Sequence, residues 1–139
     1  MTFIGDGATR TGECHEGLNF AAVQNVPAVF VIQDNGYGIG VPKREQSAND
    51  RLAENFRGIA NLKIEYCDGR DVFDCFRAME EATRYVASGE GCAIVYAECV
   101  RIGSHSNSHN HSLYRSEEEL EAARARDPLP IFRDRMLAG

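Results

Sequence analysis

Two segments of this chain are apolar at almost every position, and they constrain its fold more than any other feature. They span residues 28–32 and 92–100. A strand with one face in water alternates apolar and polar residues, whereas an unbroken apolar run indicates a strand that is buried on both faces. Such strands occur in parallel sheets that carry helices on both sides. The sequence therefore predicts an α/β fold with a doubly wound, mainly parallel sheet.

Helical patterns separate these strand-like runs. Leu18, Ala21 and Ala22 recur at helical spacing within residues 13–24, and Pro27 ends that pattern. A second long helix is predicted after the turn at residues 68–71. Its apolar positions, which alternate in spacing between four and three residues, are Val72, Phe76, Met79, Thr83 and Val86. This period predicts that the second helix packs on the sheet along that face.

The remaining segments complete the expected topology. Residues 2–4 are predicted to end a first strand, 48–57 to form a short helix and 62–66 to form a strand. Residues 103–115 are rich in Ser, Asn and His and predict a loop beyond the last strand, while Ser116 and three following glutamates begin a charged helix over 116–126. We therefore expect residues 1–139 to form a single domain in which strands and helices alternate.

Charge and composition exclude several classes of function. The chain has 15 Lys and Arg against 21 Asp and Glu, a net charge of −6, so neither nucleic acid nor an anionic membrane surface is an expected partner. No apolar stretch approaches the roughly 20 residues of a membrane-spanning helix, and the N-terminus lacks the features of a signal peptide. Five cysteines without paired spacing favour reduced thiols. These features favour a cytoplasmic location, and they are compatible with the mitochondrial matrix in a eukaryote.

Candidate ligands for a magnesium ion follow the first two predicted strands. Asp6 ends the first strand and Asn35 ends the second, and the carboxyl ends of parallel strands meet at one edge of a sheet. An Asp carboxylate, an Asn amide oxygen and a backbone carbonyl from the Gly36-Tyr37 turn form an oxygen shell that suits Mg²⁺. The helix that opens at residues 7–9 has exposed N–H groups, which favour an anion such as diphosphate. The sequence thus predicts a magnesium–diphosphate site.

The spacing of these residues resembles a known cofactor signature. Gly5-Asp6-Gly7 follows a strand, and 26 residues separate Gly7 from Asp34-Asn35. This pattern resembles the thiamine diphosphate binding signature, which ends in an asparagine at a similar distance. The resemblance implies a partial thiamine diphosphate binding fold, with thiamine diphosphate and Mg²⁺ as cofactors.

Further segments resemble one family along nearly the whole chain. They are Gly5-Asp6-Gly7-Ala8-Thr9, residues 15–22, residues 34–42, Arg101-Ile102-Gly103 with His105-Ser106, and Tyr114-Arg115. Together they resemble the carboxyl-terminal half of the alpha subunit of the decarboxylating dehydrogenase in 2-oxo acid dehydrogenase complexes. The Arg-Ile-Gly and Tyr-Arg segments are most similar to the branched-chain member, and the pyruvate and acetoin members share most of the pattern.

This resemblance implies roles for the matching residues. Asp6 and Asn35 would ligate Mg²⁺ through their side chains, and Tyr37 would do so through its backbone carbonyl. Gly7 and Ala8 would contact the diphosphate through their backbone. These assignments agree with the chemistry expected at the edge of the sheet.

A histidine and several partners are also implied. His105 would be the catalytic-loop histidine beside the cofactor, and a histidine near a reacting carbonyl can donate or accept a proton near neutral pH. In this family a 2-oxo acid is decarboxylated on the cofactor, and the acyl group passes to a lipoyl group. The implied partners are a beta subunit in an alpha2-beta2 assembly, a lipoyl-bearing acyltransferase and the 2-oxo acid substrate. An acetoin dehydrogenase alpha subunit is the alternative within the same chemistry.

The chain departs from the family pattern at two places. Thr11 stands where the family usually has an acidic or amide residue, and Arg10 precedes it, so local cofactor contacts are expected to differ. His109 follows Ser108 where the family commonly has aspartate, which is expected to change how the loop orders or engages its lipoyl partner. Ser106 and Ser108 lie where relatives in some lineages are phosphorylated.

Two alternatives come from other classes of function. His105, His109 and His111 form a tract that could bind a metal such as zinc, although no cysteine or carboxylate lies within it. The other alternative is a catalytically inactive fragment or interaction module, because family members carry a further half of the subunit before the Gly-Asp-Gly turn and take the activating glutamate from the beta subunit. We therefore expect the isolated chain to be inactive, marginally stable and self-associating through an exposed sheet edge.

Overall fold

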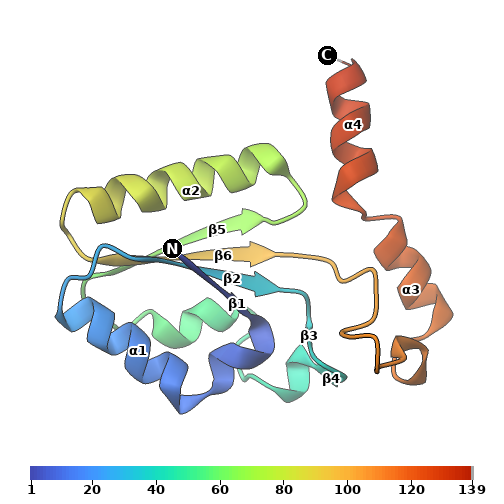
Figure 1. The fold of residues 1–139 in the computed structure, drawn as a ribbon, viewed down its shortest axis with the longest axis horizontal. Coiled ribbons are helices and arrows are strands. Elements are labelled where there is room, and N and C mark those ends of the chain that lie inside the picture. The colour runs from blue at the N-terminus through green and yellow to red at the C-terminus, as the bar shows by residue number, and fades with distance from the viewer. Residues whose placement is uncertain (139) are drawn as a thin grey trace.

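A four-stranded parallel sheet forms the centre of the protein (Figure 1). The computed structural model describes residues 1–138. The strands are β1 (Thr2–Gly5), β2 (Val29–Asp34), β5 (Leu62–Asp68) and β6 (Cys92–Glu98), in the spatial order β1-β2-β6-β5. Each neighbouring pair is parallel. The predicted α/β fold is therefore confirmed.

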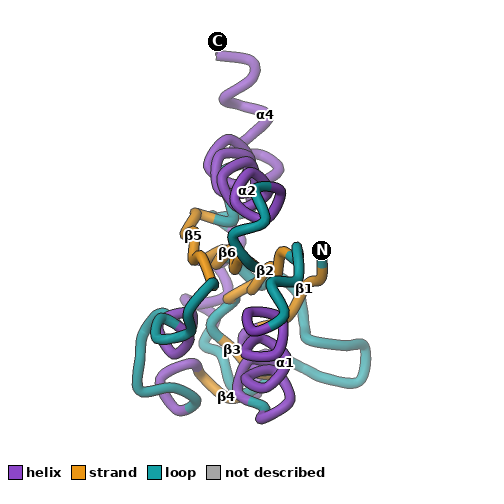
Figure 2. The backbone as a smooth tube through the Cα atoms, turned by 90° about the vertical axis from the view of Figure 1, so that its left-hand side faces the viewer, coloured by secondary structure: helices purple, strands orange, loops and turns teal. Residues whose placement is uncertain are grey.

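Helices cover both faces of the sheet (Figures 1 and 2). α2 (Val72–Ala87) packs on one face, where the buried cluster consists of Val29, Val31, Cys67, Ala78, Ala82, Val86, Ala93, Val95 and Ala97. α1 (Gly12–Val23) and the 3-10 helix η3 (Leu52–Phe56) pack on the other, where the cluster consists of Leu18, Ile32, Leu52, Ala53, Phe56, Ile94 and Tyr96. Alternate residues of β6 enter the two clusters, which explains why this strand is apolar without interruption.

The buried face of α2 differs from the predicted one. Ala78 and Ala82 are completely buried, whereas Val72 is 48% and Phe76 70% exposed, and Thr83 is exposed. Small alanine side chains let the helix lie close to the sheet, so the larger apolar residues are turned toward solvent. The predicted helix is confirmed, and two of its five predicted apolar positions pack on the sheet, since Val86 is buried and Met79 contacts the same cluster. The expectation that Val72, Phe76 and Thr83 share this face was wrong.

Capping side chains set where the helices begin. α1 follows Thr11, α2 follows Asp71 and α3 (Glu117–Arg124) follows Ser116. Each of these three side chains accepts a hydrogen bond from a backbone N–H group in the first turn of its helix, which satisfies donors that have no partner within the helix. Thr11, one of the departures from the family pattern, thus has a structural role as the N-cap of α1.

Several short elements were not predicted from the sequence. β3 (Tyr37–Gly38) and β4 (Val41–Pro42) form an antiparallel hairpin where an ordered loop is expected, and the 3-10 helix η2 (Lys43–Glu45) follows them. The 3-10 helix η4 (His111–Leu113) in the loop before α3 also was not predicted. The helix expected to open at residues 7–9 is the 3-10 helix η1 (Asp6–Arg10), and α1 begins only at Gly12.

A further helix, α4 (Pro128–Ala138), also was not predicted. It projects away from the sheet and its covering helices (Figures 1 and 2). The Phe132 ring lies 6.0 Å from the Phe73 ring, and Arg135 forms an ion pair of 2.8 Å with Asp71. Leu129 at the start of α4 remains 76% exposed, so apolar side chains of this helix face solvent in the isolated chain.

The cysteines and the sheet edge agree with the expectations from composition. The five cysteines are free thiols, and burial together with the neighbouring Cys75 raises the pKa of Cys67 to about 12, so this thiol is protonated near neutral pH. β1 is an edge strand, and its Phe3 is 58% exposed. Self-association through this edge remains a prediction.

None of the helices within residues 1–138 is long and apolar enough to cross a membrane.

Candidate functional site

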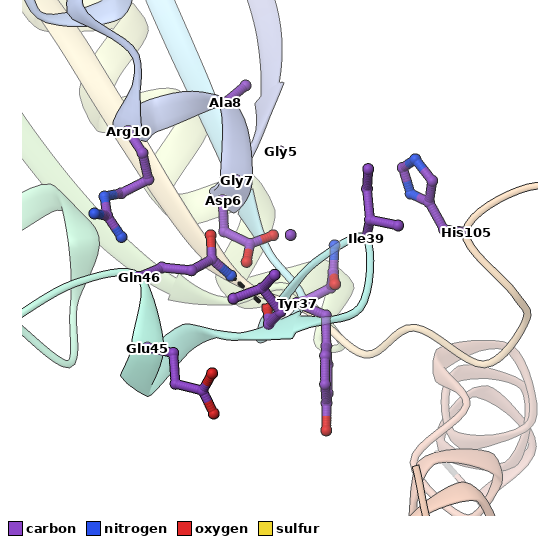
Figure 3. A pocket seen from close by; sticks show the side chains of 13 residues that line it. Gly5, Asp6, Gly7, Ala8, Arg10, Tyr37, Ile39, Glu45, Gln46 and His105 are labelled. Atoms are coloured by element: carbon purple, nitrogen blue, oxygen red, sulfur yellow. Dashed lines mark hydrogen bonds between the residues drawn. The ribbon is translucent and has the colours of Figure 1, made fainter. Parts of the chain in front are cut away.

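A cavity of about 680 Å³ opens at the carboxyl ends of β1 and β2 (Figure 3). The parallel register pairs Gly5 at the end of β1 with Gln33 near the end of β2, so the residues that follow both strands meet here. The predicted site residues all line this cavity: Asp6, Gly7, Ala8, Asn35, Tyr37 and His105. The structure therefore brings together residues that lie as far apart in sequence as Asp6 and His105.

Three buried oxygen atoms in the cavity have no hydrogen-bond partner among residues 1–138. They are both carboxylate oxygens of Asp6 and the amide oxygen of Asn35. Asp6 is only 1% exposed. Burial raises the pKa of Asp6 above its ordinary value of 3.8, and the nearby Asp34 carboxylate raises it further. Unpartnered buried oxygens of this kind are unfavourable unless a ligand binds them, and carboxylate and amide oxygens suit Mg²⁺. The residues present therefore fit the expected metal.

Asp34 holds the turn that carries Asn35. Its Oδ1 accepts a hydrogen bond of 2.9 Å from the Gly36 N–H, and its Oδ2 accepts one of 2.6 Å from the Lys43 ammonium and one from the Tyr96 hydroxyl. Gly36 adopts φ +81°, a conformation that favours glycine. Asp34 is thus a fully partnered buried carboxylate, in contrast to Asp6, and its three bonds fix the position of the turn.

The approach of η1 to the β3–β4 hairpin requires a glycine. A Cβ atom at Gly7 would lie 2.9 Å from the Cα atom of Gly38, so a larger residue would push these two backbone segments apart. The hydroxyl of Thr9, which is 2% exposed, donates to the Asp6 carbonyl over 2.7 Å and closes the same turn. The backbone of residues 7–8 is therefore held at the wall of the cavity.

The ring of Tyr37 lies in a polar cluster formed by both ends of the loop at residues 103–115. Its hydroxyl donates to Glu119 of α3 over 2.8 Å, and Arg115 donates to the same carboxylate oxygen over 2.9 Å. The Arg101 and Arg115 guanidinium groups each lie 5.3 Å from the ring centre. Burial raises the pKa of Glu119, but the hydrogen bonds from Tyr37 and Arg115 outweigh burial and hold this pKa below its ordinary value. The loop is therefore anchored to the residue expected to offer its carbonyl to the metal.

His105 lies on this loop at the exposed side of the cavity (Figure 3). Its ring centre is 5.8 Å from that of His109. The Nδ1 atom of His109 is 2.7 Å from the Ser106 hydroxyl, so His109 is bonded within its own loop. Within residues 1–138, no three His, Cys, Asp or Glu side chains are grouped to hold a metal ion. The alternative of a zinc site on the histidine tract therefore finds no support.

Sequence reasoning missed other residues that build or support the cavity. Arg10, Ile39, Val41, Glu45 and Gln46 also line it. The side chain of Gln46 donates to the carbonyl of Val41 over 2.6 Å (Figure 3). This bond holds the residue after η2 against the β3–β4 hairpin. Arg10 was recognisable as a departure from the family pattern, whereas Lys43 and Tyr96 gave no local signal because their bonds to Asp34 depend on the fold.

Comparison with known proteins gives a consistent result. The family described as the dehydrogenase E1 component matches residues 1–139. The alpha subunit of 3-methyl-2-oxobutanoate dehydrogenase from Mycobacterium tuberculosis (strain H37Rv) is 38% identical over 133 residues, which cover 96% of this chain and 36% of the relative. The E1 component alpha subunit of pyruvate dehydrogenase from Staphylococcus aureus (strain N315) is 34% identical over 134 residues, with the same two coverages.

The match covers only part of each relative. The chain spans 36% of the length of the curated relatives that it matches. Within that span the similarity is nearly continuous, and it confirms the predicted similarity to alpha subunits of 2-oxo acid dehydrogenases. The chain therefore belongs to the dehydrogenase E1 component family.

Proposed function

We propose that this chain is part of an alpha subunit that binds Mg²⁺ and thiamine diphosphate, decarboxylates a 2-oxo acid and transfers the acyl group to a lipoyl carrier. The observation that carries the proposal is the set of three buried, unpartnered oxygen atoms on Asp6 and Asn35. They face a cavity of about 680 Å³, a size typical of cofactor and ligand sites. Membership of the dehydrogenase E1 component family supports the same function.

The chain's own residues would hold the cofactor at its charged end. The side chains of Asp6 and Asn35 and the backbone carbonyl of Tyr37 would bind Mg²⁺, leaving further positions of the ion for phosphate oxygens and water. The backbone N–H groups at Gly7 and Ala8, held at the cavity wall, would donate to the diphosphate. Thiamine diphosphate, when bound, supplies the nucleophilic carbon and the electron sink for decarboxylation.

His105 would act as the proton donor and acceptor of the reaction. Its imidazole lines the cavity from a loop that is anchored at both ends by the cluster around Tyr37. As the substrate carbonyl oxygen gains negative charge, the imidazolium would donate a proton to it, and the neutral imidazole would take that proton back when the acyl group leaves. The exposed position of His105 also suits a lipoyl group that enters from solvent.

The names of the relatives indicate the class of substrate and partner. 3-Methyl-2-oxobutanoate and pyruvate are both 2-oxo acids, and the designation alpha subunit implies a beta subunit in those enzymes. We therefore assign this chain a 2-oxo acid substrate, a beta subunit in an alpha2-beta2 assembly and a lipoyl-bearing acyltransferase as partners. The beta subunit would supply the groups that activate the cofactor.

Calorimetric titration tests this proposal. Thiamine diphosphate is titrated, with and without Mg²⁺, into the chain produced together with its beta subunit, for the wild type and Asp6→Ala. Asp134→Ala is the control, because this exposed aspartate lies on α4 and does not line the cavity. The expected result is Mg²⁺-dependent binding that Asp6→Ala abolishes and Asp134→Ala retains.

Three results would contradict all or part of the proposal. Absence of binding by the wild type in the presence of both Mg²⁺ and the beta subunit would exclude a functional cofactor site. Binding that Asp6→Ala leaves unchanged would place the cofactor elsewhere. Binding followed by no decarboxylation of any 2-oxo acid in a substrate screen would favour the inactive-module alternative.

A further inference from the structure

Arg10 places a free positive charge at the wall of the cofactor cavity. It is the last residue of η1, the turn that also contains Gly7 and Ala8, and its side chain lines the cavity (Figure 3). Most arginines of the chain form ion pairs with carboxylates, for example Arg70 with Asp68. Within residues 1–138, the exposed side chain of Arg10 forms neither an ion pair nor a hydrogen bond.

The charges around the cavity favour an anionic partner for this guanidinium. Arg10 is the only Lys or Arg side chain among the described residues that line the cavity. Asp6 adds a buried negative charge to the same site, and the exposed Glu45, which pairs with Arg44, also lines it. A diphosphate carries more negative charge than one Mg²⁺ neutralises, and Asp6 increases the excess. An additional cation at the phosphate end would therefore strengthen binding, and a guanidinium is suited to paired phosphate oxygens.

The position of Arg10 distinguishes the phosphate end of the cavity from the reacting end. In Figure 3, Arg10 and His105 lie on opposite sides of Asp6. The 2-oxo acid carboxylate would be near His105, which is where protons are exchanged in the proposed function. Arg10 shares its turn with Gly7 and Ala8, whose backbone N–H groups would contact the diphosphate. The diphosphate is thus the anion within reach of Arg10.

We propose that Arg10 is an additional diphosphate-binding residue of this chain. The inference rests on the proposed function, since it assigns Arg10 to the cofactor of that same site. It also gives a role to the departure at residues 10–11: Thr11 caps α1, and Arg10 adds the positive charge that this turn otherwise lacks. The residue would raise affinity for phosphate groups and contribute nothing to recognition of the thiamine rings.

Ligands that differ only in their phosphates test this assignment. Binding of thiamine, thiamine monophosphate, thiamine diphosphate and inorganic diphosphate, each with Mg²⁺, is measured by calorimetry on the chain assembled with its beta subunit. The variants are Arg10→Gln and Arg10→Lys. Arg133→Gln is the matched control, because it removes the same charge from an exposed position on α4.

The expected result depends on the ligand. Arg10→Gln weakens binding of thiamine diphosphate and inorganic diphosphate about tenfold, as for the loss of a charged hydrogen bond, and leaves thiamine unaffected. Arg10→Lys restores part of the loss, and Arg133→Gln binds like the wild type. Because Arg10 is exposed and unpaired, Arg10→Gln is also expected to unfold at the same temperature as the wild type without ligand.

Different outcomes separate this inference from the proposed function. Equal binding of inorganic diphosphate by the wild type and Arg10→Gln overturns the role of Arg10, even where the wild type binds thiamine diphosphate. A rise in KM for the 2-oxo acid with unchanged diphosphate affinity also overturns it and assigns Arg10 to the substrate carboxylate. The wild type could also bind inorganic diphosphate through Arg10 and bind thiamine diphosphate with no higher affinity. That result would contradict the proposed function and leave the role of Arg10 intact. Binding of neither ligand overturns both.

Discussion

Two neighbouring buried aspartates are expected to respond in opposite ways to the same substitution. Asp6 and Asp34 are 1% and 3% exposed, but among residues 1–138 only the Asp34 carboxylate forms side-chain hydrogen bonds. In the absence of metal, Asp6→Asn removes a buried charge that only nearby backbone N–H groups partly offset, so the free energy of unfolding should rise by about 1 to 3 kcal/mol. Asp34→Asn breaks a buried ion pair with Lys43 and should lower it by about 3 kcal/mol.

Urea unfolding followed by far-ultraviolet circular dichroism measures both changes, because the chain contains no tryptophan for fluorescence. The protein is assembled with its beta subunit and treated with a chelator, and the measurement is repeated with Mg²⁺ and thiamine diphosphate. The ligands should stabilise the wild type and leave Asp6→Asn unchanged. A loss of stability of similar size in both metal-free variants would contradict this expectation, since it would mean that the charge of Asp6 is as well compensated as that of Asp34.

The same pair of proteins predicts a dependence on pH. The pKa of Asp6 in the folded protein is above its ordinary value of 3.8, so ionisation of Asp6 destabilises the metal-free fold at pH values above the raised pKa. As pH falls below 3.8, Asp6 is protonated in both the folded and unfolded states and the effect disappears. The difference in the free energy of unfolding between Asp6→Asn and the wild type should therefore shrink as pH falls through this range.

Three further substitutions test the surroundings of the cavity. Tyr96→Phe should destabilise the fold by about 2 kcal/mol in urea unfolding because it removes a bond to a buried carboxylate, whereas Tyr85→Phe, whose hydroxyl bonds at the surface, should change it little. Gly7→Ala should lower cofactor affinity in calorimetry at least about tenfold, because the added Cβ would meet the β3 backbone. Gly12→Ala is its control and should bind the cofactor normally, because nothing lies within contact of a Cβ at that position. His105→Ala should lower kcat by about 100-fold or more and change Mg²⁺-dependent cofactor affinity less than about threefold.

The core of the fold could be predicted because its sequence signals are local. The apolar run at residues 28–32 and the continuous run in β6 reflect burial on both faces, a property of each strand by itself. The face of α2 was misjudged because burial there depends on how closely the helix approaches the sheet, which favours Ala78 and Ala82 over the larger Phe76. Propensity and spacing carry no information about that distance.

In the candidate site, too, residues with a local sequence signal could be predicted, and residues positioned by the fold could not. Asp6 and Asn35 could be placed together because both follow strands of one parallel sheet, and a short cofactor signature links them. Lys43 and Tyr96, which fix the turn through Asp34, come from η2 and β6 and share no sequence pattern with it. The hairpin that closes the cavity is equally hard to foresee, since β3 and β4 have only two residues each.

The most direct test of the central claim is a count of the metal ions bound at Asp6. Mn²⁺ is used in place of Mg²⁺ with thiamine diphosphate and the beta subunit, and free Mn²⁺ is measured by electron paramagnetic resonance for the wild type, Asp6→Asn and Asn35→Ala. One cofactor-dependent Mn²⁺ per chain is expected in the wild type and none in either variant, because the unpartnered oxygens of these residues would form the site. The same stoichiometry and affinity in all three proteins would contradict it.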